Sequence, residues 1–158
     1  MILIPGLITW QTGQVNPGWS LASPWNEALY ISGLGLILAG LILIVKTIAL
    51  FMTAGRGTLA PWDPTQKLVV RGVYRHVRNP MISGVFAVLL GEAVLLGSRP
   101  LFRWFLLFVL INVVYIPLSE EPGLRRRFGA DYERYTKNVP RWIPRLRPWN
   151  EPVNGDNR

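Results

Sequence analysis

The chain has 158 residues, half of them hydrophobic, with a formal net charge of +8, one histidine and no cysteine. These counts exclude disulfides, thiolate catalysis and multi-histidine metal sites, so no bound metal is expected. The apolar residues gather in long uncharged runs, which favours an all-α integral membrane protein over the alternative of a soluble helical bundle.

The first 27 residues contain no run long enough to cross a bilayer. Residues 1–10 are apolar but include Pro5 and lack a basic stretch, so we expect no cleavable signal peptide. They form a short extra N-terminal segment, either interfacial or part of a further span. Turn-forming residues follow up to residue 27, where Trp19 and Trp25 suit a membrane interface.

Three apolar runs are predicted to be transmembrane helices, at about residues 28–50, 81–97 and 101–118. Their lengths approach the roughly 20 residues that a helix needs to cross the hydrocarbon core. In the first run, Gly33, Gly35 and Gly40 are expected to pack on a neighbouring helix, because small residues let two backbones approach closely.

The second and third runs are joined by only three residues, 98–100, so they predict an antiparallel hairpin. The polar blocks on either side of the hairpin then lie at the same end of the bundle. Pro80 suits the first turn of its helix and Asn79 the N-cap. Pro122 is expected to break or kink the chain after the third span, before an amphipathic helix over residues 124–138.

Residues 1–149 are predicted to form a single domain, in which residues 58–70 are an exposed loop and residues 119–148 follow the last span. Residues 150–158 are polar and expected to be disordered. Lys and Arg concentrate in residues 54–80 and 119–158, which by the positive-inside rule places the N-terminus outside and the C-terminus in the cytoplasm. The same rule explains the basic charge without nucleic acid, and the tail is expected to lie on anionic lipid.

Charged residues in and beside the spans are the candidates for chemistry. Glu120 and Glu121 either are solvated caps or accept hydrogen bonds from a polar or cationic ligand. Glu92 lies inside a span, so it is expected to face a ligand, Asn112 or another protein group. The remaining candidates are a possible general base and three arginines that either bind anions or serve as topology charges: His76, Arg75, Arg78 and Arg141.

The two polar blocks, taken together, resemble the isoprenylcysteine carboxyl methyltransferase and phospholipid methyltransferase superfamily of small membrane enzymes. The first block reads Gly72-Val-Tyr-Arg-His-Val-Arg-Asn-Pro-Met-Ile-Ser-Gly84. The second contains Glu120-Glu121, then Phe128-Gly-Ala-Asp-Tyr-Glu-Arg-Tyr135 and Val139-Pro-Arg141. The chain departs from the family pattern at Asn79, where the family usually has His, and at Ile82, where it usually has Tyr.

The resemblance implies a prokaryotic, multi-pass protein of the cytoplasmic membrane that binds S-adenosylmethionine at the cytosolic end of its helices. It implies methyl transfer to a lipophilic acceptor, a prenylcysteine-type carboxylate or a lipid amine, and leaves room for a homodimer. The implied cofactor-binding residues are Arg78, Asn79, Pro80, Gly84, Glu120, Glu121 and Tyr132. The implied catalytic residues are Arg141, Glu121 and Arg78. Two alternatives stay open, which are an NADPH-dependent membrane reductase of related helical architecture and a non-catalytic member of the family.

Overall fold

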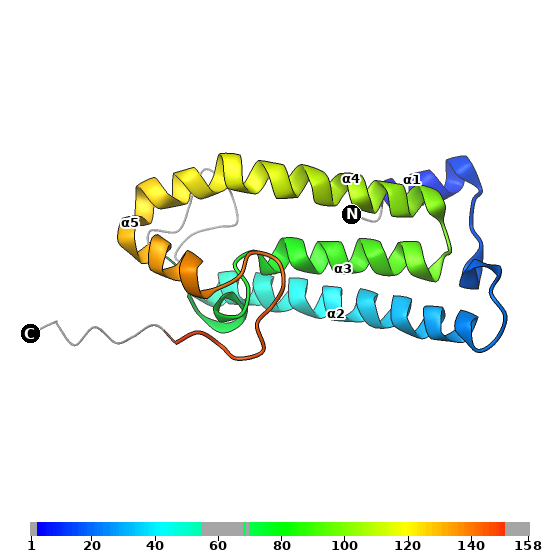
Figure 1. Ribbon diagram of the computed structural model, residues 1–158, viewed down its shortest axis with the longest axis horizontal. Coiled ribbons are helices and arrows are strands. Elements are labelled where there is room, and N and C mark those ends of the chain that lie inside the picture. Colours follow the sequence, from blue (N-terminus) through cyan, green and yellow to red (C-terminus); the bar gives the residue numbers. More distant parts are fainter. Residues whose placement is uncertain (1–2, 55–67, 69, 151–158) are drawn as a thin grey trace, which may run out of the picture.

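The computed structural model describes residues 3–54, 68 and 70–150. All regular structure in these residues is helical: α1 (Leu3–Thr12), η1 (Pro17–Ser20), α2 (Trp25–Ala54), η2 (Gly72–Arg75), α3 (Pro80–Leu95), α4 (Arg99–Tyr115), the π-helix η3 (Ile116–Glu120) and α5 (Glu121–Asn138). Helices α2, α3 and α4 run side by side, and α5 folds back across one end of them (Figure 1). Most of the predicted loop 58–70 and nearly all of the predicted tail 150–158 lie outside the described residues.

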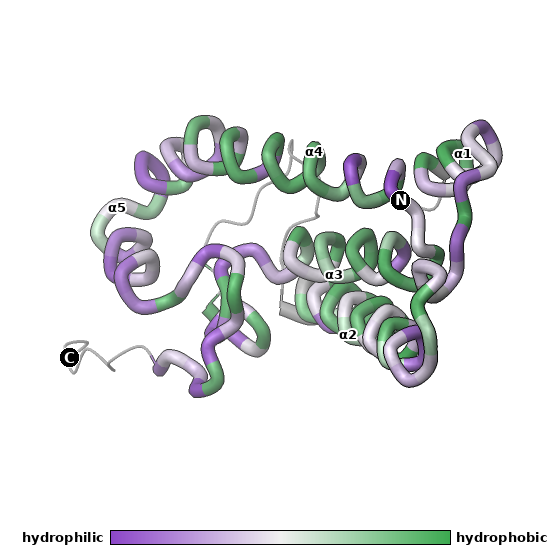
Figure 2. Tube along the Cα trace, turned by 45° about the vertical axis from the view of Figure 1, so that its right-hand side comes forward, coloured by the Kyte–Doolittle hydropathy of each residue, from purple (hydrophilic) through white to green (hydrophobic). Residues whose placement is uncertain are grey.

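Two helical stretches are long and apolar enough to cross a membrane. They are Trp25–Leu50 and the continuous run Arg99–Asn138, whose apolar part is α4. Helix α3 is equally apolar but has 16 residues, about 24 Å at 1.5 Å per residue. Hydrophobic residues follow the lengths of these helices and hydrophilic ones gather at their ends (Figure 2). The composition and the helices indicate a membrane protein.

Pairs of glycines hold α2 and α3 together in antiparallel order. A Cβ added to Gly40 would lie 2.5 Å from the carbonyl oxygen of Gly84, and one added to Gly91 would lie 2.7 Å from that of Gly33. Only glycine permits such backbone contact, which in a membrane replaces hydrophobic association as a source of helix packing. The prediction for Gly33 and Gly40 is confirmed, and that for Gly35 is wrong, because nothing lies within 4 Å of its added Cβ.

The α3–α4 turn is closed by a glycine and by the N-terminal segment. Gly97 has a φ of +57°, and the N–H of Ser98 donates to the carbonyl of Ala93 at 3.2 Å, as in a Schellman motif. The backbone N–H of Asn16 donates to the carbonyl of Leu96 at 2.9 Å, and Trp19 Nε1 donates to that of Val94 at 3.1 Å. These bonds fix the N-terminal segment to the carbonyls at the end of α3, where a helix has no further turn to pair them.

The chain does not break at Pro122, contrary to the prediction from sequence. Pro122 lies inside the continuous helical run Arg99–Asn138, and the helix continues through it. Its missing N–H is accommodated in the turn before it, where the ladder widens into the π-helix Ile116–Glu120, which also contains Pro117. The change of direction comes at Gly129, with φ 51° and ψ −127°, and it brings the second half of α5 back over the bundle end (Figure 1).

Candidate functional site

Three segments distant in sequence meet at the bundle end covered by α5. They are the connecting segment (residues 71–79), α5 itself and the C-terminal segment (residues 139–149). The backbone N–H of Arg78 donates to the carbonyl of Pro140, that of Arg145 to His76 and that of Trp149 to Arg75, each at 2.9 Å. The prediction that the two polar blocks lie together is confirmed, and the hydrogen bonds show that the C-terminal segment is fixed to the residues that precede α3.

A buried ion cluster joins these segments. Arg141 donates from Nε to Glu121 Oε1 at 2.6 Å and from Nη2 to Oε2 at 2.9 Å, a two-pronged contact. Arg78 Nη1 donates to the same Oε1 at 3.1 Å. The Glu121 side chain is 6% exposed, against 11% for Arg78 and 30% for Arg141. Both arginines that were predicted to act on a substrate are therefore bound to Glu121 in this conformation.

The ionisation of Glu121 follows from this arrangement. Burial alone would raise its pKa, but the hydrogen bond from Arg141 and the charges of Arg78, Arg141 and Arg125 outweigh burial and lower the pKa below its ordinary value of 4.5. The hydrogen bond to Glu121 likewise raises the pKa of Arg141. Glu121 is thus held as a carboxylate.

A pocket of about 350 Å³ opens beside the ion cluster, between the start of α3 and the inner face of α5. This volume lies within the usual range for small-molecule sites. Its walls are mostly apolar and aromatic, with a few polar groups, from Leu68, Tyr74, Arg78, Asn79, Pro80, Met81, Ile82, Glu120, Leu124, Phe128, Tyr132 and Tyr135.

Glu120 is the acidic residue among the described walls of this pocket. Although the residue as a whole is exposed, its pKa is raised, chiefly by the partial desolvation of its carboxyl group in the pocket wall and secondly by the neighbouring charge of Glu121. Adjacent carboxylates therefore differ in environment, since Glu121 is neutralised by two arginines and Glu120 has no ion pair among the described residues. A cationic ligand in the pocket would relieve the electrostatic strain on Glu120.

The structure brings together most of the residues predicted to bind the cofactor. Five of them line the pocket: Arg78, Asn79, Pro80, Glu120 and Tyr132. Glu121 and Arg141 lie in the ion cluster instead, and Gly84 is not among the pocket's walls because it packs against Gly40 of α2. A role for Gly84 in cofactor binding stays a prediction, whereas its contact with α2 explains why a glycine is needed there.

The residues where the chain departs from the family pattern both lie at the pocket. Asn79 occupies the N-cap of α3, as predicted, but its side chain makes no cap bond. Its backbone N–H donates to the carbonyl of Arg141 at 3.3 Å, and Nδ2 lies 3.5 Å from the same oxygen. Ile82 contributes an apolar wall. In this position a tyrosine would add a hydroxyl to the pocket.

Of the aromatic and aliphatic wall that α5 contributes, sequence reasoning predicted only Tyr132. Leu124, Phe128 and Tyr132 recur at four-residue spacing, and this periodicity indicated an amphipathic helix. The apolar face of that helix lines the pocket together with Tyr135. Tyr135 also donates its hydroxyl to the carbonyl of Tyr74 at 2.7 Å, which fixes α5 to η2.

Two other residues that the sequence suggested for chemistry, His76 and Glu92, lie away from the pocket. His76 Nδ1 lies 2.8 Å from the carbonyl oxygen of Arg145, so it carries the proton and holds the C-terminal segment. Asn112 donates to Phe108 of its own helix rather than to Glu92, and Glu92 Oε2 has no hydrogen-bond partner among the described residues. Neither His76 nor Glu92 lines the pocket.

Comparisons with known proteins show that the chain is similar to two kinds of methyltransferase. A 40% identity over 80 residues links the chain to a protein-S-isoprenylcysteine O-methyltransferase of Schizosaccharomyces pombe, covering 49% of this chain and 33% of that protein. A probable protein-S-isoprenylcysteine O-methyltransferase of Oryza sativa subsp. indica is 32% identical over 125 residues, 75% of this chain and 64% of that protein.

A phosphatidylethanolamine N-methyltransferase of Fusarium vanettenii is 29% identical over 97 residues, 59% of this chain and 10% of that protein. The chain thus spans between a tenth and about two thirds of these relatives. No solved structure matches it. The family model for phospholipid methyltransferases matches residues 28–131, from the first turn of α2 to the middle of α5, and the chain belongs to this family.

Proposed function

We propose that this protein transfers a methyl group from S-adenosylmethionine to a lipophilic acceptor at the cytosolic face of a membrane. The observation that carries the proposal is the pocket at the end of the α3–α4 hairpin, lined by Arg78, Asn79, Pro80, Glu120 and Tyr132. These are residues of the motif by which the chain resembles membrane methyltransferases, and its named relatives are methyltransferases of prenylcysteine or phosphatidylethanolamine.

The groups in the pocket fit the proposed cofactor. S-adenosylmethionine carries an ammonium, a sulfonium, a carboxylate and ribose hydroxyls. Glu120 supplies a carboxylate for the cationic groups. Arg78 lines the pocket and brings a positive charge for the carboxylate of the ligand. The aromatic wall of Phe128, Tyr132 and Tyr135 can contact the adenine ring.

The bound cofactor would supply an electrophilic methyl group, which moves in an in-line displacement to the acceptor. The chain's contribution is then to position the two reactants and exclude water. Glu121, Arg78 and Arg141 were predicted to be catalytic, and we propose that they act by holding the C-terminal segment beside the pocket. For an amine acceptor, Glu120 is the carboxylate in position to accept the proton that the nitrogen loses.

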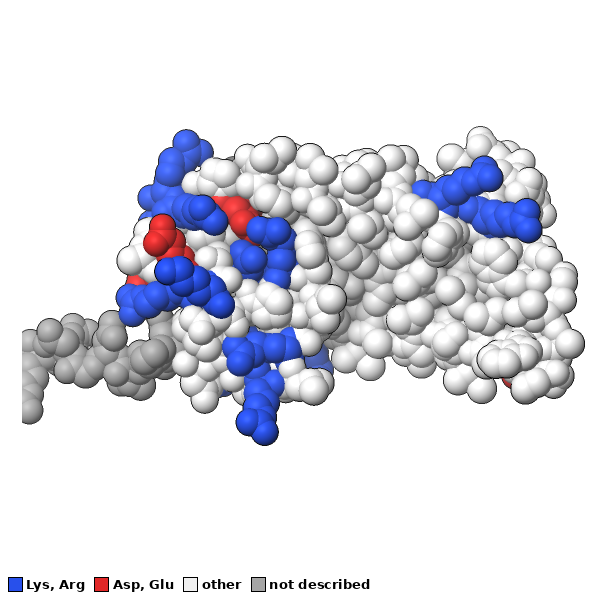
Figure 3. All heavy atoms as spheres, viewed as in Figure 1, with Lys and Arg blue, Asp and Glu red and all other residues white. Residues whose placement is uncertain are grey.

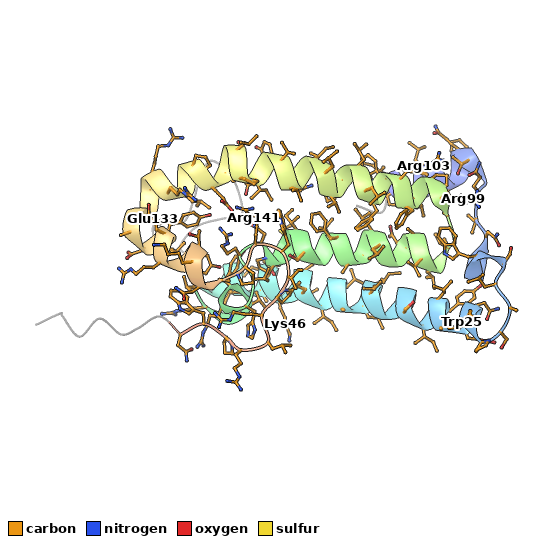
Figure 4. The ribbon with its side chains drawn as sticks, in the orientation of Figure 1. Trp25, Lys46, Arg99, Arg103, Glu133 and Arg141 are labelled. Atoms are coloured by element: carbon orange, nitrogen blue, oxygen red, sulfur yellow. The ribbon has the colours of Figure 1, made fainter. Side chains whose placement is uncertain are left out.

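We further propose that α2, α3 and α4 all span the bilayer, with the pocket on the cytosolic side. Among the described residues, Arg99 and Arg103 lie at the end of the bundle opposite α5 (Figure 4). Most other blue side chains in Figure 3 gather at the end where α5 lies. This asymmetry supports the predicted orientation, because Lys and Arg accumulate on the cytoplasmic side. An acceptor with a lipid chain would reach the pocket from within the bilayer.

The test is a transfer assay with S-adenosylmethionine labelled on its methyl group. Purified protein is incubated with prenylcysteine analogues and with membrane lipid extracts, and label is counted in the organic phase. We expect transfer to one of these acceptor classes and strong loss in Glu120→Gln. Glu133→Gln is the matched control, because Glu133 is an exposed residue of the same helix outside the pocket. Transfer to neither class would overturn the proposal, as would equal activity of Glu120→Gln and wild type.

A further inference from the structure

The C-terminal segment presents two apolar side chains to its surroundings although it is fixed to the protein on both sides. Leu146 is 98% exposed and Ile143 is 79% exposed. They lie in the C-terminal loop (residues 143–148), whose two prolines restrict its backbone. Exposed leucines occur singly on many surfaces. These two differ because the loop that carries them is held in place and has basic residues beside it.

The loop is held at three points. At its start, Trp142 packs on Phe86 of α3 with ring centroids 5.3 Å apart. At its end, Trp149 packs on Tyr135 of α5 at 6.0 Å. Between them, the backbone of Arg145 makes two hydrogen bonds to His76, one from its N–H at 2.9 Å and one to its carbonyl at 2.8 Å. The exposure of Leu146 is therefore a fixed feature of the fold.

The residues that lead into the loop lie at the level where α3 begins, and the loop itself is bonded to His76, just before that helix. The carbonyl of Trp142 accepts a hydrogen bond from Ser83 Oγ, one turn into α3, at 2.9 Å. The carbonyl of Arg141 lies beside Asn79, the N-cap of the same helix. If α3 crosses the bilayer, this level is the boundary between its hydrocarbon core and the headgroups.

The charged residues of the segment 139–150 have one sign, and the next acidic residue along the chain is Glu151. Residues 139–150 contain three arginines, at 141, 145 and 147, and no acidic residue. Arg141 is bound to Glu121. The exposed Arg147 and the partly exposed Arg145 lie beside the apolar tips, and Arg145 also donates from Nη1 to the carbonyl of Asn138 at 2.6 Å. Lys46 of α2 lies toward the same end of the bundle (Figure 4). Basic residues alternating with exposed apolar ones, bounded by two tryptophans, are typical of a segment at an anionic lipid surface.

We infer that the C-terminal loop is a membrane-inserting element, in which Ile143 and Leu146 enter the lipid layer while Arg145 and Arg147 contact anionic headgroups. The inference rests on membrane placement of the helices and not on methyl transfer. It assigns a second role to the C-terminal segment, since the lipid surface would hold the same segment that carries Arg141 to Glu121.

The absence of cysteine from the chain permits a direct test. Leu146→Cys is labelled with an environment-sensitive fluorophore, and the protein is placed in nanodiscs of phosphatidylcholine with or without phosphatidylglycerol. Quenching by lipids carrying a spin label near the headgroup reports insertion. The control is Glu133→Cys, an exposed position of α5 (Figure 4). We expect a blue-shifted, strongly quenched probe at 146 and a water-exposed, weakly quenched probe at 133.

The choice of anionic lipid is tested with Arg147→Gln in the Leu146→Cys background. The preference of the loop for anionic lipid is measured by comparing how strongly spin-labelled phosphatidylglycerol and spin-labelled phosphatidylcholine quench the probe at position 146. Loss of one arginine near a charged surface is expected to lower the preference for the anionic lipid about fivefold, whereas Arg103→Gln, at the opposite end of the bundle, leaves it unchanged.

Three results would overturn the inference. A probe at 146 as exposed and unquenched as that at 133 would place the loop in water. A blue-shifted probe that no lipid label quenches would indicate that a second copy of the chain or another protein covers the loop. Insertion without any preference for anionic lipid, or a preference that Arg147→Gln leaves intact, would show that the arginines do not bind anionic headgroups.

Discussion

The length of α3 and its start are held by opposite means. Along its length, α3 packs on α2 through glycines that bring two backbones into contact, without any charged group. At its start it is held by an ion cluster in which Glu121 binds Arg78 and Arg141. The glycine contact joins the backbones of two helices, whereas the ion cluster joins the side chains of three separate segments. We therefore expect the glycine interface to set the stability of the bundle and the ion cluster to set the position of the site.

Glu121→Gln is the substitution expected to have the largest effect. It leaves Arg78, which is 11% exposed, with no carboxylate partner in the cluster, and removing one partner of a buried ion pair typically costs about 3 kcal/mol or more. The change is measured by unfolding in mixed micelles titrated with dodecyl sulfate, together with tryptic cleavage of the C-terminal segment. Glu120→Gln is the matched control and is not expected to destabilise, because burial already disfavours its charge. Equal effects of the two substitutions would contradict the assignment of the cluster to Glu121.

Gly40→Val tests the glycine interface between α2 and α3. The new side chain would collide with the carbonyl of Gly84, and overpacking of this kind costs about 2 kcal/mol. The same titration measures it, and Gly35→Val serves as the control because nothing lies near that position. We expect the bundle to weaken while the C-terminal segment stays protected from trypsin at low denaturant. Early cleavage of that segment in Gly40→Val would show that the two regions are not independent.

The contribution of Glu121 is expected to depend on pH in one direction. Its pKa is lower in the folded protein than the ordinary value of 4.5, so the stabilisation is fully present above that value. It is lost as the pH falls from 4.5 through the folded-state pKa, where the carboxylate takes up a proton. The difference in unfolding free energy between wild type and Glu121→Gln should be constant from pH 7 to about 5 and shrink below 4.5. A difference that grows on acidification would contradict the ion cluster.

Ile82→Tyr is expected to have the smallest effect. A hydroxyl at this wall of the pocket offers one hydrogen bond to a polar ligand, worth about 1 kcal/mol, or about fivefold tighter binding of S-adenosylmethionine. Ile82→Phe adds the ring without the hydroxyl and separates the two contributions. Calorimetric titration of both variants checks this, and equal affinities would show that the hydroxyl finds no partner.

The contrast between the two regions also explains what could be predicted from the sequence. The apolar runs and the role of Pro80 follow from local pattern, and the glycine contact follows from small residues within a span. Gly35 was wrongly included because sequence alone does not say which face of α2 meets α3. The break expected at Pro122 was wrong because the helical ladder accommodates this proline by widening into the π-helix before it, and the chain changes direction at Gly129 instead.

The sequence indicated several residues of the site but not how they contact one another. Resemblance to a family motif indicated Arg78, Asn79 and Glu120, and all three line the pocket. It could not show that Arg141 and Arg78 would both bind Glu121, because that depends on a non-local fold of residues 139–149 onto residues 75–79. The spacing of Leu124 and Phe128 was visible, but only the packed structure distinguishes a pocket wall from a lipid-facing surface.

The central claim is that the pocket beside Glu120 binds S-adenosylmethionine, and calorimetric titration of the purified protein in detergent tests it most directly. We predict saturable binding of one molecule per chain, weakened severalfold by Glu120→Gln and unchanged by Glu133→Gln. Absence of binding to a folded wild-type protein, or binding that Glu120→Gln leaves intact, would contradict the assignment of this pocket.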